Sequence, residues 1–362
     1  MATDMAYGFI GLEHLFGQRI KEVGVERVRG LIEATTTAWN TEINAMMGGW
    51  ATRSTIAKER VELPGSGTLE PLDETGWGNP TPAKEFGHYD VGYPIQAGGA
   101  AWGTNRVTAA LMTLDEANRQ MLFVMRKDAN WLRQRMLAAI FGNAEWTYTD
   151  KFLGDVAVKP LANGDSVTFL KNGQTQPSTS QHYLAQAQGI SDAYNPIPTI
   201  YDLLQAYPSK SGPYVVYIPT NLKSTIEALS DFTKVNDPDI DPAITRDRII
   251  AGNGQGDRAV AFPGGRIFGK TDYCWIVEWR ALPDNYMIGV AMGAGKFLRL
   301  REWDDTSLQG LFPEYYSPDG NLNLNRFIRY AGFGVYNRVA AVVCQIGNAS
   351  YTPPTGFVTP LP

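Results

Sequence analysis

The sequence predicts an α+β fold, in which helices and strands occupy separate segments, on the basis of three observations. One long stretch, residues 114–141, has the apolar spacing of a single helix. Short apolar runs typical of strands are concentrated in the second half of the chain. The 362 residues include 37 glycines and 22 prolines, above average usage, which indicates many turns and long excursions. With 44% hydrophobic and 19% charged residues, the chain can bury a core in two or three compact units.

Charge, hydropathy and cysteine content exclude several classes of protein. A formal net charge of -5 argues against a dedicated nucleic-acid binder, because such proteins carry a basic patch. No apolar run approaches the ~18–20 residues needed to span a bilayer, and residues 1–11 lack the pattern of a secretory signal. Cys274 and Cys344 lie in separate apolar segments and are interpreted as buried, reduced thiols. We therefore expect neither a membrane partner nor export.

Residues 1–60 carry two amphipathic helical stripes separated by a break at Gly24. The second stripe ends at residues 47–49, where two consecutive glycines follow a methionine. The stripes consist of Leu12, Leu15, Phe16 and Ile20, followed by Val28, Ile32, Trp39, Ile43 and Met46. Such an arm has to bury its apolar face, either on the chain's own core or on a neighbouring subunit.

Residues 61–105 contain nine glycines and five prolines and show no sustained apolar face. Loops longer than ~12–15 residues are uncommon in compact domains unless they have a function or are disordered. This stretch is rich in aromatic residues, which disordered segments lack. We interpret it as an extended hairpin that docks on another chain; the alternative is packing on the chain's own long helix. The candidate inter-subunit contacts are Trp77, Phe86, Tyr89, Tyr93 and Trp102.

The clearest local signals define the helix at residues 114–141. Thr113 and Glu116 have the spacing of a capping box, and acidic residues at the start complement the helix dipole. Gly142 supplies the stop. Asn163-Gly164 then predicts a hairpin between strands at residues 155–162 and 166–171.

A second mixed unit follows a polar junction at residues 173–198. Thr220 is expected to cap a helix that ends at Leu229. Further helices are predicted at 198–206 and 243–251, and strands at 213–218, 273–278, 286–291, 297–301 and 326–346, the last returning to the first sheet. The tail, residues 348–362, contains four prolines and is expected to form an extended surface arm.

No motif supports a catalytic, cofactor or metal site. The glycines at 252–256 are interpreted as a flexible turn, and residues 293–296 lack the first glycine and the serine or threonine of a phosphate loop. Asp237, Asp239 and Asp241 alternate as in a calcium loop, but proline replaces the required glycine. The acidic run at 302–305 is interpreted as a solvated edge. The histidines at 14, 88 and 182 form no metal-binding pair. We expect no cofactor, no metal and no enzymatic activity.

Two local patterns and the order of elements resemble one family. Residues 265–277 and 282–289 show a glycine-ended strand, an apolar strand, a Leu-Pro turn and another apolar strand; residues 327–338 precede a final apolar run. The chain thus resembles the major capsid proteins of tailed double-stranded DNA bacteriophages, which have the Hong Kong-type fold. The resemblance implies an N-terminal arm (1–60), an extended loop (61–112), a spine helix with a peripheral domain (113–195), an axial domain (196–324), return strands (325–347) and a C-terminal tail (348–362).

The resemblance implies self-assembly into hexamers and pentamers of an icosahedral shell, in the virion and, during assembly, in the host cytoplasm. Scaffold, portal or decoration proteins are the implied partners, and the enclosed DNA is not bound sequence-specifically. An encapsulin-type compartment, which has the same fold but encloses a cargo enzyme, is the nearer alternative. A two-domain α/β enzyme or ligand-binding protein is the more distant one.

Overall fold

The computed structural model describes residues 25–62, 88–105, 111–164, 166–172, 174, 178–207, 212–234, 266–316 and 322–361. The chain forms two compact units, each built from segments distant in sequence. Unit 1 comprises residues 1–44, 95–133 and 302–331; unit 2 comprises 45–94, 134–301 and 332–362. Helices and strands occupy separate segments, so the α+β prediction is confirmed.

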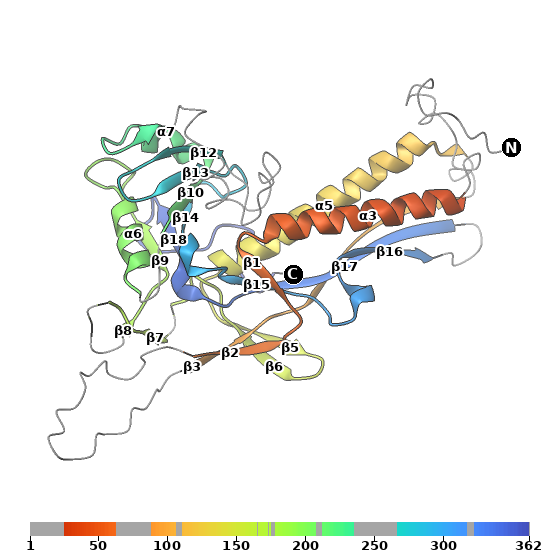
Figure 1. The fold of residues 1–362 in the computed structure, drawn as a ribbon, viewed down its shortest axis with the longest axis horizontal. Helices are drawn as coiled ribbons and strands as arrows, with labels where there is room; N and C mark the ends of the chain where they lie inside the picture. Colours follow the sequence, from red (N-terminus) through yellow and green to blue (C-terminus); the bar gives the residue numbers. More distant parts are fainter. Residues whose placement is uncertain are drawn as a thin grey trace, which may run out of the picture. The chain divides into compact units, whose positions relative to one another are not determined.

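Unit 1 consists of two long helices on a sheet. Helix α3 (Val25–Met47) and helix α5 (Leu114–Phe141) contribute their first parts to it. The sheet has β17 (Leu322–Val335) between β4 (Gln96–Asn105) and β16 (Leu311–Tyr316), with both pairs antiparallel. The helices run beside each other along these strands (Figure 1). Their shared core contains Ile32, Met112, Ala117, Met121, Val124, Met125, Leu311 and Phe327.

Helix α5 spans the 28 residues that its local signals predict. The Thr113 hydroxyl accepts a hydrogen bond from the Glu116 N–H at 3.3 Å, and the Glu116 carboxylate accepts one from the Thr113 N–H at 3.1 Å. This reciprocal pair is the capping box, which satisfies two backbone donors at the helix start.

The largest sheet of unit 2 has seven strands, in the order β11-β12-β13-β10-β14-β18-β9. Pairs β10–β13 and β18–β9 are parallel and the other pairs antiparallel. The central strands β14 and β18 are buried along their whole length, as expected for strands covered on both faces. The bounds are β9 (Tyr183–Gln186), β10 (Tyr214–Ile218), β11 (Thr233–Lys234), β12 (Arg266–Lys270), β13 (Trp275–Glu278), β14 (Tyr286–Ala291) and β18 (Ala341–Ile346).

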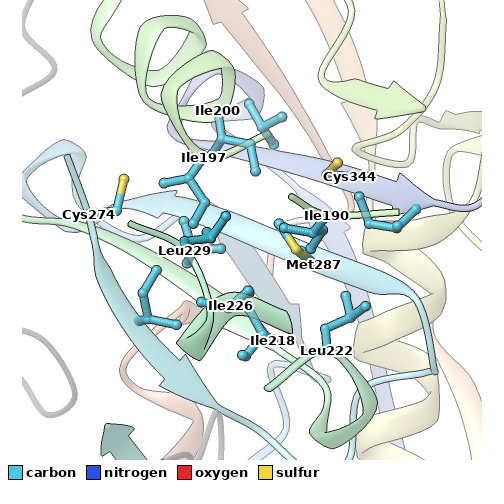
Figure 2. Close-up of a cluster of buried hydrophobic side chains, with 14 of the residues drawn as sticks. Ile190, Ile197, Ile200, Ile218, Leu222, Ile226, Leu229, Cys274, Met287 and Cys344 are labelled. Carbon is cyan, nitrogen blue, oxygen red and sulfur yellow. The ribbon is translucent and has the colours of Figure 1, made fainter. Parts of the chain in front are cut away.

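Two helices cover this sheet, α6 (Ile197–Gln205) and α7 (Lys223–Glu227). Figure 2 shows Ile197 and Ile200 of α6 among the side chains of the resulting core. Gly289 of β14 permits this packing, because a Cβ atom there would collide with the Ile200 side chain. Short 3₁₀ helices lie at Thr220–Leu222, Met292–Ala294, Thr306–Leu308 and Arg338–Ala340.

The remaining strands of unit 2 form small ladders. Strand β15 (Leu298–Arg301) pairs in parallel with β1 (Ala51–Ser54) and antiparallel with the last residues of β17. Three two-stranded antiparallel pairs complete the unit: β2 (Lys58–Glu62) with β3 (His88–Gly92), β5 (Trp146–Asp150) with β6 (Gly154–Val158), and β7 (Thr168–Phe169) with β8 (Ser178–Thr179).

The hairpin predicted around Asn163-Gly164 is wrong. Strand β6 pairs antiparallel with β5, which precedes it in the chain, across a turn at residues 151–153. Asn163 is only 6% exposed, and its carbonyl accepts a hydrogen bond from Arg338 Nη2 at 2.6 Å. A tertiary contact therefore takes the place of the local turn preference.

Three other expectations need correction. Thr220 does not cap a helix; its hydroxyl donates to the Glu278 carboxylate at 3.1 Å. Strand β18 does not join the sheet of β17 but lies between β14 and β9. The tail at 347–361 has no helix or strand, yet it is anchored to unit 2, where the Tyr351 hydroxyl donates to the Phe141 carbonyl at 2.8 Å. The helix predicted at 243–251 and the stripe at 12–20 lie outside the described residues.

Candidate functional site

The five predicted contact residues lie in different parts of the chain, and two of them are not described by the structure. Trp77 and Phe86 lie outside the described residues. Trp102 lies in β4, opposite Asn325 of β17. Tyr89 lies in β3, and Tyr93 directly follows this strand.

Tyr89 and Tyr93 are core residues and have no surface to offer a neighbour. Tyr89 is 6% exposed and its hydroxyl donates to the Tyr336 carbonyl at 3.1 Å. Tyr93 is fully buried, and its hydroxyl donates to the Glu59 carboxylate at 2.9 Å. Burial, followed by the nearby Glu59 charge, raises the pKa of Tyr93. Neither the docking prediction nor packing on the long helix describes these two residues, which instead share a core with Val91, Phe169 and Tyr207.

Strand pairing and ion pairs fix the base of the extended loop. Asp90 lies between Lys58 at 2.8 Å and Arg60 at 3.0 Å. Hydrogen bonds from Arg60 and then Lys58 lower the pKa of Asp90 to about 2. The last cross-strand pair is Glu62 with His88, so residues 63–87 connect the two ends of a regular ladder.

Unit 1 contains a buried polar network that the sequence did not reveal. Arg329 of β17 binds Asp128 of α5 through two hydrogen bonds, of 2.6 and 2.8 Å. The same guanidinium donates to Asn40 of α3 at 2.8 Å and lies 3.8 Å from the Glu302 carboxylate. Glu302 is 2% exposed, so the prediction of a solvated acidic edge is wrong at this position. The indole of Trp39 donates to Asp128 at 2.9 Å, and the network thereby links both helices to the sheet.

A cavity of about 210 Å³ lies in unit 1, between α5 and the strands. Its lining is Gly98, Gly99, Ala100, Val124, Lys127, Asp128, Trp131 and Leu311. A glycine is required at position 98, because a Cβ atom there would lie 2.7 Å from the Trp131 ring. Most lining residues are small or apolar, so the cavity suits an apolar occupant.

The described residues include two of the three histidines, His88 and His182, and both cysteines. No group of three or more His, Cys, Asp or Glu side chains among them is arranged to hold a metal ion. His182 is 1% exposed beside Phe169, and its burial, followed by the Arg338 charge, lowers its pKa well below 6.5. Cys274 and Cys344 are free and buried, as predicted, and burial raises the pKa of each thiol to about 12.

Two sequence motifs and one histidine remain outside the described residues: the glycines at 252–256, the alternating aspartates at 237–241, and His14. Across the part of the chain that the structure describes, none of the helices has the length and apolar character needed to cross a membrane.

Comparison with known proteins identifies the fold. No protein-family model and no curated protein matches the chain. A chain in a solved structure of Mycobacterium phage Patience is 18% identical with a TM-score of 0.66, and the alignment covers 99% of both chains. The same fold is therefore also present in a phage protein over nearly its full length.

Two other solved structures are more distantly similar. A capsid of the empty GTA particle is 11% identical with a TM-score of 0.47, covering 84% of this chain and 90% of that one. A capsid of the cyanophage P-SCSP1u is 12% identical with a TM-score of 0.46, covering 84% and 88%. Because both TM-scores are below 0.5, neither likeness carries weight for the function of this chain.

Proposed function

We propose that this chain is the major capsid protein of a tailed, double-stranded DNA bacteriophage, and that it assembles as hexamers and pentamers into an icosahedral shell. The observation that carries the proposal is the likeness to the Mycobacterium phage Patience chain, which extends over 99% of both chains. A likeness of this extent includes the long helices and both large sheets, not a single shared motif.

In this proposal the chain has the Hong Kong-type arrangement, and each segment has a structural role. Residues 1–60 are the N-terminal arm, 61–112 the extended loop, and 113–195 the spine helix and peripheral domain. Residues 196–324 form the axial domain at the capsomer centre, 325–347 the return strands and 348–362 the tail. The 28-residue helix α5 supports the spine role, and five strands of the seven-stranded sheet come from residues 196–324. Of the return strands, β17 pairs with β4, whereas β18 joins the seven-stranded sheet together with β9.

The extended loop docks on an adjacent subunit. Trp77, Phe86 and Trp102 are its candidate anchors, because large aromatic side chains dominate the binding energy of protein interfaces. Tyr89 and Tyr93 have a different role here: they fix the base of the loop in the core of their own subunit.

A loop replacement tests this role. Because Glu62 and His88 are direct cross-strand partners, replacing residues 63–87 by Asn-Gly closes the β2–β3 hairpin with a two-residue turn. The variant should fold with the circular dichroism spectrum of the wild type but form no shells in negative-stain electron microscopy. Normal shells would refute the docking role of the loop.

The proposed shell encloses DNA without binding its sequence, and the net charge of -5 is compatible with that task. Its partners are further copies of itself together with scaffold, portal or decoration proteins. It acts in the virion after assembly in the host cytoplasm, and it has no catalytic role.

Electron microscopy and size-exclusion chromatography of the purified wild-type protein test the shell itself. Closed shells or capsomer rings are expected, and a uniform monomer or dimer would contradict the proposal. Particles purified from infected cells should protect DNA from nuclease. A co-purifying enzyme in place of DNA would favour the encapsulin-type alternative.

A further inference from the structure

The β5–β6 hairpin presents two large apolar side chains to solvent. Phe152 and Leu153 lie in its turn and are 75% and 57% exposed. Scattered single apolar residues are normal on protein surfaces, whereas a contiguous exposed apolar patch can mark an interaction site. We call this pair the apolar tip.

A buried ion pair fixes the shape of the turn. Asp150 accepts hydrogen bonds from the N–H groups of Phe152 at 2.9 Å and Leu153 at 3.1 Å. Its second carboxylate oxygen accepts one from Arg301 at 2.7 Å, and the two side chains are 1% and 3% exposed. Arg301 also donates to the Tyr93 carbonyl at 2.7 Å. The apolar tip is therefore pre-ordered, and a pre-ordered group loses less conformational entropy when it binds.

The unit 1 cavity has the size and chemistry to receive an aromatic ring. An apolar cavity of about 150 Å³ can hold a benzene molecule, and this cavity measures about 210 Å³. Gly98, Gly99 and Ala100 leave the space open, and Val124, Trp131 and Leu311 supply apolar walls. Lys127 lines the cavity and already lies 4.7 Å from the ring centroid of Phe123, so its ammonium can also interact with an entering ring.

We propose that Phe152 of one copy of this chain inserts into the unit 1 cavity of a second copy. The inference rests on the proposed function, since a shell of identical subunits requires contacts between copies. The apolar tip and the cavity share no residue, so the contact is heterologous: one surface of each copy binds a different surface of the next. A heterologous contact generates a ring when its rotation closes, which is what hexamers and pentamers require.

The side chain of Phe152 is 75% exposed and therefore has apolar surface to bury on a partner. Burying a phenylalanine side chain contributes enough to change an association constant by about ten- to a hundredfold per contact. In a ring, every subunit makes this contact once as donor and once as acceptor, so the effect of losing it is multiplied around the ring.

Cross-linking between distinguishable copies tests the contact. Lys151→Cys beside the tip and Lys127→Cys at the cavity are co-expressed on chains with different affinity tags and treated with a short bismaleimide. The native thiols, Cys274 and Cys344, are 3% and 0% exposed and do not compete. A cross-linked dimer carrying both tags is expected. Thr35→Cys, exposed on α3 in unit 1, replaces Lys127→Cys in the control and should give none.

Assembly variants provide the second measurement. Phe152→Ser removes the ring, and Ala100→Leu fills the cavity from inside; each should raise the protein concentration needed for assembly by at least tenfold. Val358→Ser is the matched control, since Val358 is 56% exposed in the same unit, and it should leave assembly unchanged. Unfolding midpoints equal to or above that of the wild type confirm that Phe152→Ser and Ala100→Leu remain folded.

The possible outcomes separate the two proposals. If wild-type shells form but neither variant affects them and no mixed dimer appears, the Phe152 contact is wrong and the capsid proposal stands. If only Ala100→Leu blocks assembly, another segment fills the cavity and the contact is again wrong. A mixed dimer without rings or shells would support the contact and overturn the capsid proposal.

Discussion

Replacing Arg329 by methionine should destabilise unit 1 more than any single surface change. The guanidinium is 1% exposed and holds Asp128 through hydrogen bonds of 2.6 and 2.8 Å. Methionine has a similar length but no charge, so the variant leaves two carboxylates without their cation: Asp128, 4% exposed, and Glu302, 2% exposed. Asp128 keeps the hydrogen bond from the Trp39 indole, and Glu302 keeps the one from the Gly310 N–H; both are neutral donors.

The expected cost follows from the burial of the pair. Removing one partner of a buried ion pair costs about 3–5 kcal/mol, and removing both partners in favour of apolar residues costs much less. Asp128→Leu alone should therefore also cost about 3–5 kcal/mol. The double variant should cost clearly less than the sum, because the Arg329–Asp128 pair is removed as a unit. What remains is the loss of the Arg329 charge beside the buried Glu302 and the loss of the Trp39 N–H acceptor, the latter at about 1–3 kcal/mol.

Urea unfolding at pH 7, followed by tryptophan fluorescence and circular dichroism, gives these free energies. Arg326→Met is the matched control on the same strand; its pair with Glu314 is 3.9 Å long and about half exposed, so the loss should stay under about 1 kcal/mol. A double variant whose cost equals the sum of the single costs would refute the reasoning, since the two side chains would then act independently.

Three further changes should affect stability in defined ways, all measured by the free energy of unfolding. The pKa of His182 lies well below 6.5 in the folded chain, so as the pH falls below 6.5 the imidazole is protonated in the unfolded chain but not in the folded one. The free energy of unfolding should therefore drop by up to about 1.4 kcal/mol per pH unit. His182→Phe should remove this contribution to the pH dependence. Gly289→Val should cost about 1–3 kcal/mol by pushing Ile200 and helix α6 away from the sheet, and an unchanged midpoint would contradict this packing. Thr113→Ala should cost about 0.5–2 kcal/mol by breaking the capping box with Glu116, and a neutral result would show that the cap contributes nothing.

Helix α5 and strand β14 were predicted to the residue because their signals are local. A capping box, an acidic first turn and apolar spacing all lie within the helix that they define. For β14, a continuous apolar run between turns was sufficient. The period-two alternation of Tyr89, Val91 and Tyr93 was an equally local signal that these tyrosines point into a core, but their place in a long loop favoured the docking interpretation.

The errors come from contacts between distant residues. Arg329 and Asp128 are 201 positions apart, and nothing in either neighbourhood identifies the partner of the other. The hairpin turn forms at residues 151–153 and not at Asn163-Gly164. At residues 151–153 the Asp150 carboxylate accepts hydrogen bonds from two backbone N–H groups of the turn, and Gly154 adopts a φ of 71°. Arg301 holds that aspartate from 151 positions away, so the deciding interaction is again invisible to local sequence reasoning.

Two buried Asp–Arg pairs of the described residues occur at the two surfaces proposed to meet. Asp150–Arg301 orders the apolar tip, and Asp128, which lines the cavity, is held by Arg329. A buried ion pair gains little net stability because its desolvation offsets the attraction, but it restricts the geometry of the groups that it joins. A shell needs such restriction, since small errors in each contact accumulate around a closed ring. Asp150→Asn removes the charge that pairs with Arg301 and should therefore make the apolar tip less ordered. This variant should reduce ring formation even at temperatures where the subunit stays folded.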